Sequence, residues 1–128
     1  MDKILEIEQE LIEASPENIQ SISYLMEIGG RIAGYIAFTG SEVAKAKRVL
    51  LNAKKAAYFK TMEQLKKEGK DVAPSLVKDY VGTMVAQEEE RYLLCDRMNA
   101  ACTHQLTFIN VCISALKTEM QTINFHNK

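Results

Sequence analysis

The strongest chemical signal in the sequence is a group of cations around one phenylalanine. Residues 41–70 hold nine Lys and Arg residues beside three acids. In a helix of about 100° per residue, most of these cations fall on an arc away from the apolar stripe, with Phe59 in its middle. Cations beside an exposed aromatic ring are typical of sites for single-stranded nucleic acid, because phosphates meet the cations while bases stack on the ring. The predicted site comprises Lys45, Arg48, Lys54, Lys55, Phe59, Lys60, Lys66, Lys67 and Lys70.

The same residues also allow a plainer interpretation. Phe59 would then lie in the core of an oligomer, and the lysines would only keep a helix surface solvated. The net charge of −1 hides separate blocks, since residues 1–40 carry −5, residues 41–70 carry +6 and residues 71–128 carry −2. Such separation indicates an anionic partner, a charge-matched self-association or a helix face laced with ion pairs.

Catalytic and metal-binding patterns are weak in this sequence. His104 and His126 have no partner at metal-ligand spacing. The adjacent acids of residues 88–90 diverge around a helix instead of converging on a substrate. With no constellation for acid–base or nucleophilic chemistry, we expect a non-enzymatic protein without metal or cofactor.

The cysteines and the chain's first residues bear on the compartment. Cys95, Cys102 and Cys112 lie on one predicted helix, which makes local disulfides geometrically unfavourable, so we expect buried thiols in a reducing environment. The acidic start lacks the basic and apolar runs of a signal peptide, and no apolar stretch approaches the roughly 18 residues of a membrane span. These features predict a cytoplasmic location and no membrane partner.

Helical periodicity extends through nearly all of the 128 residues, which is the size of one domain, and predicts an all-α fold. Ser15 and Pro16 form a helix-start signal, while Thr39, Gly40 and Ser41 read as a stop followed by a new cap. Few Gly and Pro residues interrupt the remainder. The predicted single domain, 1–128, contains a short acidic amphipathic helix in 1–15, two helices in 16–68 that meet near residue 40, a turn at 69–74 and one long helix over 75–124.

The long predicted helix carries apolar residues at alternating steps of three and four, which form a heptad seam. A helix of 50 residues is about 75 Å long, so the two helices of 16–68 would lie end to end and antiparallel to it, in an elongated hairpin. A break near residues 95–101 would instead give a compact four-helix bundle. A slender hairpin leaves the seam partly uncovered, so we expect a homo-oligomer in which Asn99 sets the register. The predicted oligomer interface comprises Tyr92, Asn99, Leu106, Ile109, Ile113, Leu116, Met120 and Ile123.

The order of these parts forms a recognisable series over roughly residues 20–125. A first helix ends in a short polar stop, a helix rich in Lys, Arg and Ala follows, and a polar turn containing Gly leads into a long helix with an acidic middle and an apolar end. The corresponding segments are the stop at 38–41, the basic helix at 45–67 with Lys54, Lys55, Ala56, Ala57, Tyr58 and Phe59 at its centre, the turn at 68–71, the acids at 88–90 and the apolar end at 108–117.

This series resembles the recombination mediators of T-even-like phages, the UvsY type. The resemblance implies a small all-helical protein that assembles into rings, binds single-stranded DNA and helps to load a RecA-like recombinase past a single-strand-binding protein. It carries DNA binding over to Lys54, Lys55, Lys66, Lys67 and Lys70. The chain departs from the family in lacking Arg in its turn and in the acidic segment that precedes residue 19.

The leading functional hypothesis is therefore an oligomeric accessory protein that binds single-stranded DNA. Several copies would present their basic helices side by side, and multivalency would strengthen weak individual sites. The alternative is a non-enzymatic helical module for protein–protein interaction, such as a phage structural or assembly protein or an inhibitor of a host complex. Its basic helix would bind acidic protein, including the acidic N-terminal helix of this same chain.

Overall fold

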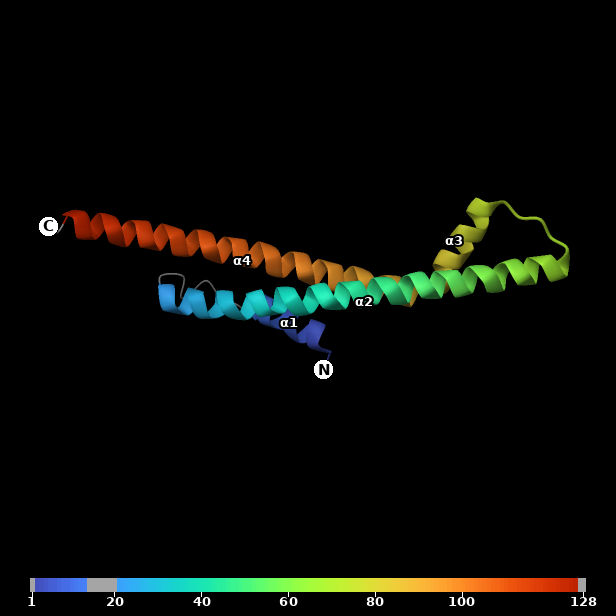
Figure 1. Cartoon of the computed structure of the whole chain (residues 1–128), viewed down its shortest axis with the longest axis horizontal. Coiled ribbons are helices and arrows are strands. Elements are labelled where there is room, and N and C mark those ends of the chain that lie inside the picture. Colours follow the sequence, from blue (N-terminus) through green and yellow to red (C-terminus); the bar gives the residue numbers. More distant parts are fainter. Residues whose placement is uncertain (1, 14–20, 127–128) are drawn as a thin grey trace. The chain divides into compact units, whose positions relative to one another are not determined.

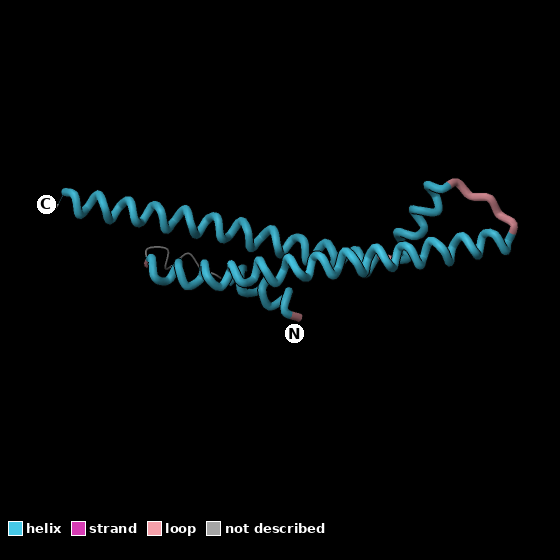
Figure 2. The backbone as a smooth tube through the Cα atoms, in the orientation of Figure 1, coloured by secondary structure: helices cyan, strands magenta, loops and turns pink. Residues whose placement is uncertain are grey.

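The computed structural model describes residues 2–13 and 21–126, with side chains as far as residue 124. Within these residues 93% are helical and none lies in a strand, which confirms the all-α prediction. Figure 1 shows the helices in chain order, and Figure 2 shows the loop that joins the second helix to the third. Their bounds are α1 Lys3–Glu13, α2 Ile22–Glu68, α3 Pro74–Met84 and α4 Ala86–His126.

Contacts divide the chain into two compact units. Unit 1 comprises Met1–Gly40 and Arg97–Lys128, and unit 2 comprises Ser41–Asp96. Each unit has its own apolar cluster. The single domain expected from chain length stays a prediction, and the helix start expected at Ser15 and Pro16 lies outside the described residues.

Unit 1 packs α1 and the last part of α4 around the first part of α2. Its core is a cluster of buried side chains from all three helices. A Cβ added at Gly29 of α2 would meet the side chains of Ile109 and Leu106 at 3.5 and 3.7 Å, so this glycine lets α4 approach closely. Gly40, which lies further along α2 than Gly29, lies against Asn99, which comes earlier in α4 than Leu106 and Ile109. The two helices therefore run antiparallel, as predicted. The buried members are Ile7, Leu25, Ile32, Cys102 and Ile109.

Helix α1 is fixed to α2 by polar contacts as well as by its apolar side. Arg31 donates a hydrogen bond to Glu10 at 2.7 Å, and the Tyr35 hydroxyl donates another to the same carboxylate. These hydrogen bonds hold the pKa of Glu10 below its usual range, and they raise the pKa of both Arg31 and Tyr35. The α1 expected from the sequence is confirmed, with its position set by one shared carboxylate.

The helix stop expected at Thr39, Gly40 and Ser41 is wrong, because α2 runs unbroken from Ile22 to Glu68. Thr39 is fully buried, and its hydroxyl donates back to the Tyr35 carbonyl at 2.7 Å. The same oxygen accepts a bond from the Asn99 side-chain amide at 3.0 Å. A threonine whose hydroxyl is bonded to the preceding turn needs no helix end to satisfy it, so the polar triplet is compatible with a helix interior.

Unit 2 packs the second part of α2 against α3 and the first part of α4. Helix α2 ends at Glu68, and Gly69 adopts a left-handed conformation with φ of 66° that favours glycine. The Lys70 amide then donates to the Leu65 carbonyl at 3.0 Å, and Pro74 begins α3. This agrees with the predicted turn at 69–74. The buried members of its core are Leu50, Ala57, Val77, Val81 and Val85.

The single long helix expected over 75–124 is also wrong, because the chain leaves helical geometry at Val85, where φ is −110° and ψ is 23°. Val85 is buried in the core of unit 2, while its carbonyl accepts from the Glu89 amide and so begins α4. Glu88 and Glu89 lie in the first turn of α4, where the helix dipole favours negative charge. The alternative break near residues 95–101 is absent, since α4 continues through them.

Candidate nucleic-acid interface

The cations predicted to bind nucleic acid lie on the second part of α2 and in the loop that follows it. Lys54 is half-buried, and the other seven cations of the predicted site are exposed. They do not form one uniform surface. On a helical wheel of about 100° per residue, Lys45, Lys60 and Lys67 lie on a flank that they share with Glu42 and Glu63. Arg48, Lys55 and Lys66 occupy a different side.

The ion pairs follow this division in part, since among the described residues Lys60 of the flank that holds the acids and the half-buried Lys54 also have no carboxylate within ion-pair distance. Lys45 lies 3.3 Å from Glu42, Lys67 lies 3.7 Å from Glu63, and Lys70 lies 3.4 Å from Glu68. Across residues 2–13 and 21–126, by contrast, Arg48, Lys55 and Lys66 have no carboxylate within ion-pair distance. Their positive charge is therefore directed into solvent without local neutralisation.

Phe59 points outward among these three cations. Its side chain is 61% exposed, and the neighbouring Tyr58 is 39% exposed. The two rings meet edge to face, with centroids 6.3 Å apart and an interplanar angle of 70°. Such pairs are favoured by the ring quadrupoles, so Tyr58 helps to hold the orientation of Phe59 while leaving the ring's surface open.

We call this side of α2 the outer face, defined by Arg48, Leu51, Lys55, Tyr58, Phe59, Met62 and Lys66, all of which are exposed. With Lys45 at zero, these residues lie between about 220° and 320° of the wheel. The acids Glu42, Glu63 and Glu68 lie between about 0° and 140°, so the outer face contains no acid. Leu51 and Met62 were not among the site residues predicted from the sequence. The signal that could have identified them is the spacing of residues 51, 55, 58 and 62, whose steps of four, three and four place them on one side of a helix.

The outer face ends in a hollow of about 720 Å³ beside the loop after α2. Phe59, Met62 and Lys66 line it from the helix, and Lys70 lines it from the loop. Two cations and one aromatic ring therefore border the same concavity, together with the acids Glu63 and Asp71. This places Lys70 next to the outer face although it lies beyond the end of the helix.

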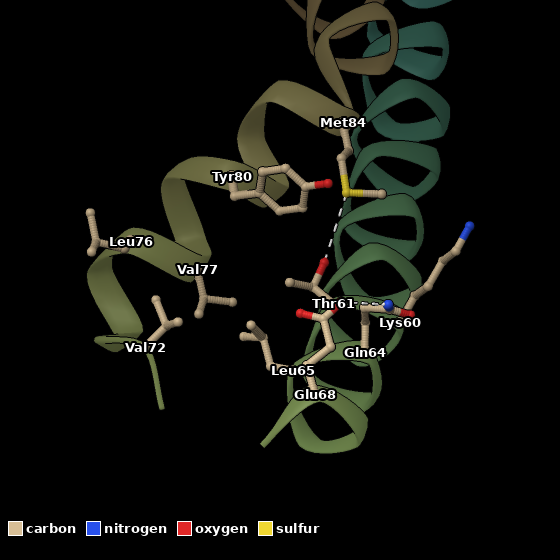
Figure 3. A pocket seen from close by; sticks show the side chains of 10 residues that line it. All are labelled: Lys60, Thr61, Gln64, Leu65, Glu68, Val72, Leu76, Val77, Tyr80 and Met84. Atoms are coloured by element: carbon tan, nitrogen blue, oxygen red, sulfur yellow. Dashed lines mark hydrogen bonds between the residues drawn. The ribbon is translucent and has the colours of Figure 1, made fainter. Parts of the chain in front are cut away.

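A second hollow, of about 570 Å³, separates α2 from α3 (Figure 3). It is bordered by Leu65, Val77 and Tyr80, and the Thr61 hydroxyl lies 3.8 Å from the Met84 sulfur. Glu68, on its rim, accepts a hydrogen bond from Gln64, and this bond lowers the pKa of the Glu68 carboxyl. Its lining is mainly apolar.

The predicted oligomer interface is largely occupied within the chain. Ile109 is buried, and Leu106, Ile113 and Leu116 are half-buried against the core of unit 1. Asn99 donates to the Ile36 carbonyl at 3.1 Å as well as to Thr39, while Tyr92 packs on the core of unit 2. The exposed members of the predicted interface are Met120 and Ile123, at 54% and 51%. Association through this seam stays a prediction.

The remaining candidate groups are dispersed. His104 is exposed, and the side chain of His126 lies outside the described residues. Among the described residues, no three His, Cys, Asp or Glu side chains gather as a metal would require. Cys95 and Cys102 are fully buried, and burial raises the pKa of the Cys102 thiol.

Two further findings frame the site. None of the helices in the described part of the chain combines the length and the apolar character needed to cross a bilayer. The chain matches no protein-family model, no curated protein and no solved structure.

Proposed function

We propose that this chain is an oligomeric, non-enzymatic accessory protein that binds single-stranded DNA along the outer face of α2. Its role would be to help load a RecA-like recombinase onto DNA covered by a single-strand-binding protein, as the resemblance to phage recombination mediators implies. The observation that carries the proposal is the exposed ring of Phe59 among Arg48, Lys55 and Lys66, none of which is neutralised by a carboxylate of the described chain.

The arrangement suits a flexible polyanion. Lys55 lies one turn before Phe59 and Lys66 two turns after it, so a strand along the face would meet a cation on each side of the ring. A base stacked on Phe59 would contribute about 1–3 kcal/mol without selecting a sequence. One such site is weak, so several copies acting on one strand would supply the affinity.

The test is a fluorescence anisotropy titration with oligo-dT over a range of salt concentrations. Lys55→Gln and Lys66→Gln should each weaken binding and lower the slope of log affinity against log salt by about 0.7. Phe59→Ala should weaken binding without changing that slope. The matched controls are Lys78→Gln and Lys117→Gln, which remove exposed cations from α3 and α4. Absence of binding at low salt, or equal losses in the controls, would contradict the proposal.

A protein-interaction module is the second candidate function, covering phage assembly proteins and inhibitors of host complexes. The observation in its favour is that Leu51 and Met62 are 54% and 41% exposed on the same face. Binding of phosphates does not require exposed apolar side chains, whereas binding of a protein commonly uses them. This candidate predicts that Leu51→Ser abolishes an association that persists at high salt, with oligo-dT left unbound. Loss of DNA binding in Lys55→Gln with no effect of Leu51→Ser would exclude it.

A further inference from the structure

Helix α1 presents a second amphipathic surface that its own unit does not cover. Its inner side is buried, with Ile4 and Ile7 0% and 1% exposed. On the opposite side Leu5 and Ile12 are 43% and 71% exposed. Because the hydrogen bonds of Glu10 to Arg31 and Tyr35 hold the inner side on α2, the outer side is directed away from unit 1.

The outer side of α1 is acidic. On a wheel of about 100° per residue with Ile4 at zero, the exposed acids Glu6 and Glu13 lie within about 120° of both Leu5 and Ile12. The one cation of α1, Lys3, lies on another side, with its amine 5.3 Å from the centre of the Tyr35 ring. We call Leu5, Glu6, Gln9, Ile12 and Glu13 the α1 outer face.

The two outer faces match in charge, spacing and length. That of α2 combines cations with exposed apolar residues and lacks acids, whereas that of α1 combines acids with exposed apolar residues and lacks cations. Leu5 and Ile12 are seven residues apart, as are Leu51 and Tyr58, so two turns separate the apolar groups in each pair. The 11 residues of α1 are about as long as the stretch from Leu51 to Met62.

We propose that the α1 outer face of one copy docks on the α2 outer face of a second copy and competes there with single-stranded DNA. The competition rests on the function proposed above, whereas the contact between copies does not. The interface joins two different surfaces, so each copy can give α1 to one neighbour and accept α1 from another, which builds rings or chains. Its small area and exposed charges make it reversible and sensitive to salt, which lets a polyanion displace it.

The decisive test uses two variants with complementary defects. Leu5→Ser with Ile12→Ser removes the apolar part of the α1 outer face without changing the net charge, and leaves its inner side intact. Lys55→Glu with Lys66→Glu removes the docking surface on α2. Neither variant should associate with itself through this contact, whereas a mixture should form a heterodimer, detected by light scattering. The matched control, Met26→Ser with Val111→Ser, removes two other exposed apolar side chains of unit 1.

The DNA titration separates the two proposals. With total protein at about ten times the self-dissociation constant of the contact, roughly a quarter of the α2 outer faces are free in wild type, so Leu5→Ser with Ile12→Ser should tighten oligo-dT binding about fourfold because the competitor is gone. If the mixture associates but no form binds DNA, the contact is supported and the proposed function is overturned. If wild type binds DNA but the mixture does not associate, or the control variant alters mass and affinity to the same extent, the contact is overturned and the function stands.

Discussion

Replacing Gly40 by alanine is expected to stabilise the protein, because this glycine lies inside α2 and not at a helix end. Positive φ among the described residues occurs at Gly69, where it is 66°, and not at Gly40. A Cβ at position 40 would meet the Asn99 side-chain amide at 3.6 Å, which is ordinary van der Waals contact. Alanine in a helix interior is favoured over glycine by about 0.5–1 kcal/mol, so we expect a gain of that size in the free energy of unfolding.

Urea denaturation followed by circular dichroism at 222 nm measures this change, with an unchanged m value as the sign of an unaltered unfolding transition. Gly30→Ala is the matched positive control, since a Cβ there meets nothing within 4 Å. Gly69→Ala is the negative control, because a left-handed conformation costs an L-residue roughly 1–2 kcal/mol. If Gly40→Ala lowers stability while Gly30→Ala raises it, the helix is interrupted at residue 40 and the reasoning fails.

Two further predictions concern titratable groups in unit 1. Because hydrogen bonds from Arg31 and Tyr35 lower the pKa of Glu10, the stability they give α1 is present above the ordinary pKa of glutamate and is lost as the pH falls through the lowered value. Amide exchange in α1, corrected for intrinsic rates, should therefore accelerate on acidification in wild type and not in Glu10→Gln. Burial raises the pKa of the Cys102 thiol, so brief alkylation of the native protein should modify the half-buried Cys112 first, as read by mass spectrometry. Earlier modification of Cys102 would contradict its burial.

The sequence was a reliable guide where periodicity was long and a poor one where single residues decided. Cys95, Cys102 and Ile109 are buried, as the steps of three and four predicted, because repeated burial on one side of a helix leaves that pattern. The same pattern continues to Met120 and Ile123, which are exposed. The predicted helix ends were wrong because the sequence alone does not show how a polar group is bonded or where a side chain packs. Thr39 resembles a cap until its hydroxyl is seen bonded within the helix, and Val85 resembles a helix interior until its packing in unit 2 is known.

The candidate site was likewise predicted in part from the sequence. The outward position of Phe59 and of the cations around it followed from an angle of about 100° per residue. The separation of Lys45 and Lys67 from Lys55 and Lys66 follows from the same angle, because Glu42 and Glu63 lie three and four residues before Lys45 and Lys67 in one helix. Counting cations along the chain therefore overstates the charge that a ligand would meet. The position of Lys70 at the hollow beside Phe59 did not follow from that angle, because it depends on the path of the loop after α2.

The hydrogen bond between Thr39 and Asn99 restricts which substitutions the core of unit 1 can accept. Apolar positions along α4 can exchange one aliphatic side chain for another of similar volume at small cost. A change of Asn99 to leucine leaves Thr39 with its carbonyl partner but places an apolar group against a buried hydroxyl, while a change of Thr39 to valine removes one acceptor of the amide. Sequences that keep this fold should therefore change the two positions together, as a polar pair or as an apolar pair.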